Sequence, residues 1–210
     1  SKILPVKCTD DSYATGQVIA ALDGIRYAAD MRAKVINCSF GAAADPNGVQ
    51  AYQAVVDYAY AKGALVVAAS GNFSINNDQT PHFPANLKGV LSVGASTSQD
   101  SAAGFSHYGV SVKVYAPGVN ILTTQLGAGY VSNSVSGTSF SAPITAGVAA
   151  LVWAMHPGWT PDQVAMQIRA TADNLKVPSA AYAPYFHKRV NAYRAVNLNK
   201  TFDGSAITTL

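Results

Sequence analysis

The sequence is poor in cysteine and in charge. It holds 2 cysteines in 210 residues, too few for a disulfide scaffold or a cysteine-based zinc site. Charged residues make up 12% of the chain and the net charge is +3 without a basic cluster, so no dedicated nucleic-acid surface is expected. No run approaches the roughly 18 consecutive apolar residues of a membrane span, since the closest, 144–155, is short and alanine-rich. We therefore expect neither a nucleic acid nor a membrane as a partner.

Apolar residues are abundant, at 49% of the chain, which excludes a disordered polymer. Short apolar runs alternate with segments of helical periodicity. The predicted strands are 3–8, 34–38, 64–69 and 90–95, and the predicted helices are 15–32, 46–61, 138–155, 161–173 and 190–196. This order, with strands that are apolar throughout, is typical of an α/β fold with a buried parallel sheet. Residues 105–133 predict loops and small antiparallel strands.

The segment 136–143, Ser-Gly-Thr-Ser-Phe-Ser-Ala-Pro, is the sharpest candidate for chemistry. It is a polar turn that opens the long apolar helix predicted over 138–155. A serine there lies among unpaired backbone N–H groups at the positive end of the helix dipole, where a tetrahedral oxyanion could be bound. The alternative is an ordinary Ser/Thr helix cap, which by itself is the commoner role.

The segment 137–143 closely resembles the nucleophile signature of the subtilisin-like serine proteases. The resemblance continues in the family's order along nearly all of residues 3–196, through segments 35–41, 66–72, 83–85, 90–95, 105–109, 116–118 and 189–192. It implies a three-layer helix–parallel sheet–helix fold. Residues 1–199 would form the C-terminal part of one catalytic domain, and the aperiodic residues 200–210 a tail or linker.

The resemblance also assigns roles to individual residues. Ser139 would be the nucleophile, and Asn72 would donate its side-chain amide to the oxyanion, although Gly-Asn is also common in turns. The residues that would bind substrate are Ser39, Phe40 and Gly41, as an edge that pairs with the substrate backbone, and Ala68, Ala69, Ser70 and Gly71, as one wall of the primary specificity pocket.

The family's catalytic Asp and His motifs are absent from this sequence. The four histidines lack the family's context and are interpreted as surface or loop residues: His82, His107, His156 and His187. Residues 3–8 resemble the strand just after the family's catalytic His helix, and in that fold the Asp strand lies between the strands matching 3–8 and 34–38. We therefore expect an N-terminal fragment of the same domain, as a second chain, to supply the Asp, the His and a central strand. The break would be autolytic, a maturation event or an artefact of handling.

No cofactor is required by this interpretation. A structural calcium ion is conceivable, but Thr97 stands where a calcium-binding Asp follows in proteinase-K-like relatives, and no metal ligands are assigned. Cys8 and Cys38 are expected to be free thiols in apolar strands, because the inferred strand order separates them. An extracellular location is implied by the family alone.

Two other functions remain open. One is a non-catalytic pseudoprotease that holds extended peptides on the 39–41 edge. The other is an acid-acting sedolisin-type enzyme, but that group has Asp where Asn72 stands here. The small residues at 68–71 predict a pocket for apolar or aromatic side chains, and Asp78 is the one nearby candidate for a pocket that binds basic ones.

Overall fold

The computed structural model describes residues 1–9, 18–43, 48–124, 129–131, 135–177, 180–185 and 187–198. Its main sheet has six strands in the order β1-β3-β5-β6-β10-β9. The bounds are β1 (Val35–Cys38), β3 (Leu65–Ala69), β5 (Val90–Ser96), β6 (Val114–Pro117), β10 (Lys188–Arg189) and β9 (Asp173–Asn174). All neighbouring pairs are parallel except β10 with β9. The strands predicted at 34–38, 64–69 and 90–95 are confirmed as β1, β3 and β5.

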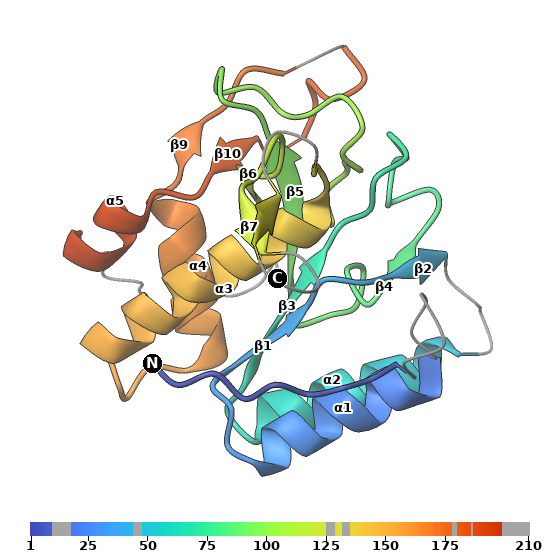
Figure 1. Ribbon diagram of the computed structural model, residues 1–210, viewed down its shortest axis with the longest axis vertical. Coiled ribbons are helices and arrows are strands. Elements are labelled where there is room, and N and C mark those ends of the chain that lie inside the picture. Colours follow the sequence, from blue (N-terminus) through green and yellow to red (C-terminus); the bar gives the residue numbers. More distant parts are fainter. Residues whose placement is uncertain are drawn as a thin grey trace.

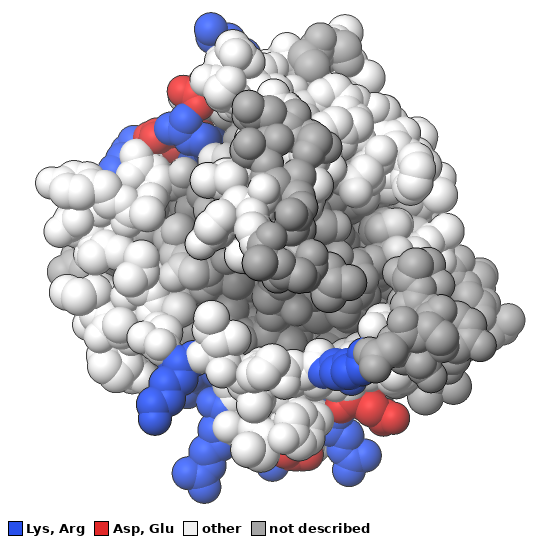
Figure 2. Space-filling view, in the orientation of Figure 1, with Lys and Arg blue, Asp and Glu red and all other residues white. Residues whose placement is uncertain are grey.

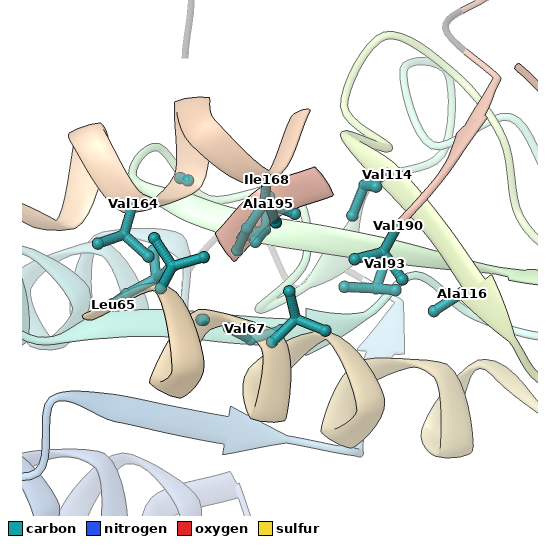
Figure 3. Close-up of a cluster of buried hydrophobic side chains, with 14 of the residues drawn as sticks. Leu65, Val67, Val93, Val114, Ala116, Val164, Ile168, Val190 and Ala195 are labelled. Atoms are coloured by element: carbon teal, nitrogen blue, oxygen red, sulfur yellow. The ribbon is translucent and has the colours of Figure 1, made fainter. Parts of the chain in front are cut away.

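Helices cover the sheet on both faces, which confirms the three-layer α/β fold (Figure 1). One face packs against α1 (Val18–Asp30) and α2 (Val49–Ala61), and the other against α3 (Thr138–Met155), α4 (Pro161–Ala170) and α5 (Ala192–Asn197). Every residue of β3 is buried, because its side chains alternate between the two layers. Leu65 and Val67 join the cluster under α3 and α4 (Figure 3). Val66 and Ala68 join the cluster under α1 and α2.

The strand predicted for residues 3–8 is wrong. Residues 1–9 are described without strand pairing, and they run across α1, where Cys8 Sγ lies 2.5 Å from the position of a Cβ on Gly24. The physical reason is that an isolated strand is stable only beside a partner strand. Among the described strands, β1 has one neighbour, β3, and stands at the edge of the sheet.

Two further two-stranded sheets lie outside the main one. β2 (Ala42–Ala43) pairs antiparallel with β4 (His82–Phe83), and β7 (Thr123–Thr124) with β8 (Tyr130–Val131). The second pair confirms small antiparallel strands within 105–133. The same range also contains β6, which pairs parallel with β5 and β10 in the main sheet, so for 114–117 the prediction of loops and antiparallel strands is wrong. The strands β2, β4, β9 and β10 were not predicted, because two-residue strands carry no periodic signal. Residues 200–210, predicted as a tail, lie outside the described residues.

The long helix α3 has the predicted bounds and is the central packing element. By length and composition it could cross a membrane, with a mean hydropathy of 1.4 over 18 residues. It packs against β1, β3, β5 and β6, and 44% of it is buried inside the structure. Its outer side exposes Leu151 and Met155, which are 52% and 59% exposed.

Candidate active site

Ser139 lies in the first turn of α3, after Gly137 and Thr138. Its side chain is half-buried, and within the described ranges its hydroxyl has no hydrogen-bond partner. Its backbone N–H belongs to the first turn, where α-helical N–H groups have no intrahelical acceptor. A free hydroxyl therefore lies beside a free N–H donor at the positive end of the helix.

The neighbouring serines have structural partners. Ser141 Oγ donates to the carbonyl of Ala116 at 2.9 Å and is fully buried. Ser136 Oγ accepts from the backbone N–H of Asn120 at 3.0 Å. Of the three serines in the 136–141 segment, Ser139 alone lacks a partner in the described part of the chain. The geometry thus separates Ser139 from both neighbours.

Asn72 follows the carboxyl end of β3 and reaches the start of α3. Its Oδ1 accepts from the Thr138 backbone N–H at 2.8 Å and from the Thr138 hydroxyl at 2.9 Å. The same hydroxyl accepts from the Gly71 N–H at 3.2 Å, so Thr138 ties the two elements together. Because Oδ1 is held, the amide Nδ2 is left as a donor, and it lies 3.4 Å from the position of a Cβ on Gly137. The arrangement brings the candidate nucleophile and the candidate oxyanion donor together.

Gly71 allows the chain to turn sharply between β3 and Asn72. Its φ is +116°, and a Cβ there would lie 2.3 Å from the imidazole of His107. Glycine is therefore required for both backbone conformation and space. His107 in turn donates its backbone N–H to the Gly71 carbonyl at 2.9 Å.

The predicted substrate edge follows β1 directly. Ser39 is half-buried and accepts a hydrogen bond from the Asn37 amide at 2.9 Å, while Phe40 and Gly41 are exposed. Ser39 and Phe40 lie between β1 and β2, outside any described strand pairing. This segment is accessible to an extended peptide.

The predicted pocket wall is more buried than its assigned role requires. Ala68, Ala69 and Ser70 are at most 3% exposed and belong to the sheet interior. A cavity of about 170 Å³ instead lies against residues that sequence reasoning did not assign to a pocket, including Phe73, His82 and His107. No local pattern could have found them, because they come from three separate loops and strands. The wall role of residues 68–71 stays a prediction.

The four histidines, which were predicted to be surface or loop residues, differ in their burial. His107 lies in a loop, which is one of the two predicted alternatives, but at 2% exposed it is not a surface residue. It is buried because its ring fills the space that Gly71 leaves. His82 and His187 are half-buried, and His156 stacks on Trp159 with ring centroids 3.8 Å apart.

Neither a metal cluster nor a reactive thiol is evident in the described part of the chain. No group of three or more His, Cys, Asp or Glu side chains gathers there. Both cysteines are free, and burial, with Cys8 nearby, raises the pKa of Cys38 to about 12, so its thiol stays protonated.

Charged side chains gather toward the lower rim and the upper left of the face in Figure 2, and the visible described atoms between them are uncharged.

Comparison with known proteins gives consistent matches. A family model described as "Subtilase family" matches residues 1–188. Thermitase of Thermoactinomyces vulgaris is 38% identical over 197 residues, covering 93% of this chain and 65% of thermitase. Subtilisin amylosacchariticus of Bacillus subtilis subsp. amylosacchariticus is 39% identical over 166 residues, covering 79% of this chain and 42% of that protein. The chain thus spans less than two thirds of either relative.

Solved structures agree with these sequence matches. A lanthipeptide protease superposes with a TM-score of 0.79 at 27% identity, covering 91% of this chain and 68% of that one. A cold adapted subtilisin-like serine proteinase superposes with a TM-score of 0.75 at 29% identity, covering 85% of this chain and 62% of that one. Fold and site define an α/β protein with a free serine hydroxyl at a helix start beside an asparagine amide. The chain belongs to the subtilase family of subtilisin-like serine proteases.

Proposed function

We propose that this chain is the nucleophile-bearing part of a serine endopeptidase. The observation that carries the proposal is the free hydroxyl of Ser139 beside the amide of Asn72, whose oxygen is held by Thr138. Ser139 attacks the peptide carbonyl and forms an acyl-enzyme, which water then hydrolyses. The Asn72 amide and the Ser139 N–H donate to the oxyanion as its charge develops.

Substrate binds as an added strand. The Ser39–Gly41 backbone pairs with the extended peptide, as in other β-augmentation complexes. Residues 68–71 and the cavity beside them receive the substrate side chain next to the scissile bond. We propose that no cofactor takes part, so a chelator such as EDTA is expected to leave the reaction of Ser139 unchanged.

The general base comes from outside these 210 residues in this proposal. An N-terminal fragment of the same domain, as a second chain, supplies a His that takes the Ser139 proton and an Asp that orients its imidazole. Three observations support this: among the described residues β1 stands at the sheet edge, residues 1–9 pair with no strand described here, and the relatives compared are longer than this chain. Family membership supports an extracellular location.

Intact-mass spectrometry of the native sample before and after a fluorophosphonate tests the proposal. A second polypeptide and a single adduct at Ser139 are expected. Ser139→Ala should remove the adduct, and the control Ser136→Ala should keep it. A second polypeptide without an adduct would instead support the peptide-binding pseudoprotease, and size-exclusion chromatography that shows a folded monomer of this chain alone would refute the two-chain assembly.

A further inference from the structure

The cavity beside the candidate active site has the size of a single side chain. Its volume of about 170 Å³ is below the roughly 300–1,000 Å³ of pockets that hold whole small molecules. It is lined by residues 41–43, by Phe73 and Ile75, by residues 80–82 and by His107. Apart from Thr80 and two histidines, no lining side chain can form a hydrogen bond.

The position of the cavity links it to the reacting centre. Residues 41–43 continue directly from the substrate edge, and Phe73 follows Asn72 in the chain. The His107 ring contacts Gly71, the residue before Asn72. A peptide paired with the 39–41 edge would therefore have a side chain next to the cavity mouth, which makes this location depend on the proposed function.

Asn77 fixes the proton on the His107 ring. The Asn77 Nδ2 donates to the Ser70 carbonyl at 2.9 Å, so its Oδ1, 2.7 Å from His107 Nδ1, must be an acceptor. Nδ1 therefore carries the hydrogen, and in the neutral ring Nε2 is an acceptor. Burial, with His82 adding in the same direction, lowers the pKa of His107 to about 4, so the ring is neutral near pH 7.

The acceptor on His107 is buried and unsatisfied. Its Nε2 has no partner within the described residues, and the side chain is 2% exposed. A buried acceptor without a partner is costly, so a ligand that supplies a donor gains what the free protein lacks. A ligand group that cannot donate leaves that cost in place.

The cavity carries no charged side chain that would recognise an ion. His82 lies edge-on to His107, with ring centroids 5.1 Å apart, and burial lowers its pKa as well. Asp78, the candidate for basic specificity, does not line the cavity, because its carboxylate accepts from the N–H groups of Val110 and Ser111. A charged side chain entering the cavity would be desolvated without a counter-ion.

We propose that His107 determines substrate specificity, with its Nε2 accepting a hydrogen bond from an uncharged donor at the tip of an otherwise apolar substrate side chain. Tyrosine meets this description and phenylalanine does not. The same rule favours glutamine over glutamate, and it disfavours lysine because of its charge. Asn77 acts as a positioning residue that holds the ring in the required tautomer.

Peptide binding tests the proposal without relying on turnover. N-acetyl tetrapeptides that differ only in a C-terminal Tyr, Phe, Glu or Lys are titrated by NMR into the protein as isolated, with any polypeptide that accompanies it. We expect the Tyr peptide to bind about tenfold more tightly than the Phe peptide, and both more tightly than the charged ones. Equal or tighter binding of the Phe peptide, or no saturable binding by any of the four, overturns the proposal.

Variants locate the effect at His107. His107→Asn should reduce the Tyr/Phe affinity ratio to about one. The matched control is His156→Asn, because His156 also has a buried Nε2 without a partner but lies outside the cavity. It should keep the tenfold ratio, and an unchanged ratio in His107→Asn refutes the assignment.

A second measurement covers the case in which His107→Asn does not fold. In the wild-type protein labelled with ¹⁵N-histidine, the His107 Nε2 resonance should have the chemical shift of an unprotonated ring nitrogen. It should move when the Tyr peptide is added and stay in place with the Phe peptide. A protonated Nε2 in the free protein at neutral pH contradicts the proposal.

The two proposals can fail separately. If the fluorophosphonate does not react but the Tyr/Phe ratio depends on His107, the protease function fails and the specificity assignment stands. If Ser139 is labelled but the Tyr/Phe ratio does not depend on His107, the protease function stands and the specificity assignment fails. Ser139→Ala should abolish labelling and keep the binding preference.

Discussion

Asn72 has two ends with different surroundings. Its carbonyl oxygen is held by two hydrogen bonds from Thr138, and its amide group has no partner within the described residues. This fixes the direction of the amide before substrate arrives, which is what makes an oxyanion donor effective. The side chain at position 72 is therefore expected to act on the rate more than on binding.

Asn72→Ala should lower kcat by about 100- to 1,000-fold with little change in KM, because the donor acts on charge that develops in the transition state. Steady-state kinetics are measured on a preparation that reacts with the fluorophosphonate. Asn197→Ala is the control, because that amide donates to the Tyr193 carbonyl on α5. A kcat for Asn72→Ala equal to that of the control would refute the role.

Gly71→Ala should destabilise the fold by about 3 kcal/mol, since it adds a side chain at positive φ and against a buried ring. Urea unfolding measures the change. Gly147→Ala is the matched control: Gly147 lies within α3, where a Cβ would meet nothing within 4 Å. That variant should gain about 1 kcal/mol or less through helix propensity. Equal stabilities for the two variants would contradict the packing argument.

His107 also couples stability to pH. Its pKa falls from 6.5 to about 4 on folding, because burial disfavours the charged ring. Between these values the unfolded chain binds a proton that the folded chain does not, so stability falls as pH decreases from about 6.5 to 4. The loss at the acidic end is on the order of 3 kcal/mol.

Urea unfolding at pH 7 and at pH 4 should show this loss reduced in His107→Asn. The lowered pKa values of His82 and His187 act in the same direction and should remain in that variant. An identical pH dependence in the wild type and the variant would exclude His107 as its source.

The elements differ in how well the sequence predicted them. The helix predicted over 138–155 has those bounds, because its apolar run is framed by a polar glycine turn and by Pro157. The helix predicted over 46–61 is described from Val49, and the one over 161–173 ends at Ala170. The strand at 3–8 was wrong, because strand formation depends on a neighbour that an apolar pattern does not reveal.

The start of α4 gives a test at the scale of one element. Thr160 and Gln163 form a reciprocal capping box, with Pro161 at the first helical position. Thr160→Ala should cost about 1 kcal/mol of unfolding free energy by leaving an N–H without its acceptor. Thr160→Ser keeps the oxygen and should cost less than half as much. If both variants lose the same free energy in urea unfolding, the cap is not the cause.

At the scale of the whole molecule, the described structure has an open side. β1 is the last strand of the sheet as described, and apolar side chains are exposed near it and on the outer side of α3. Ile3 is 92% exposed, although large apolar residues are usually buried. An unpaired strand edge is a template for another strand.

Adding an N-terminal fragment that carries the Asp strand and the His helix should therefore form a one-to-one complex that unfolds at a higher temperature than any transition seen with this chain alone. Binding of a partner to the folded state stabilises it by mass action. The control fragment carries two prolines in the Asp strand, which remove ladder donors. Thermal unfolding and size-exclusion chromatography measure both effects. Equal Tm shifts with both fragments would contradict strand insertion.

The sequence by itself determined the five helices, the buried parallel strands β1, β3 and β5, and the candidate pair Ser139 and Asn72. Each is encoded locally, by an apolar period or by a short motif at the end of an element. The tertiary structure decided that Thr138 ties Asn72 to α3, that residues 1–9 form no strand, and that His107 is buried beside a cavity. These features depend on contacts between residues far apart in the chain, which no local pattern records.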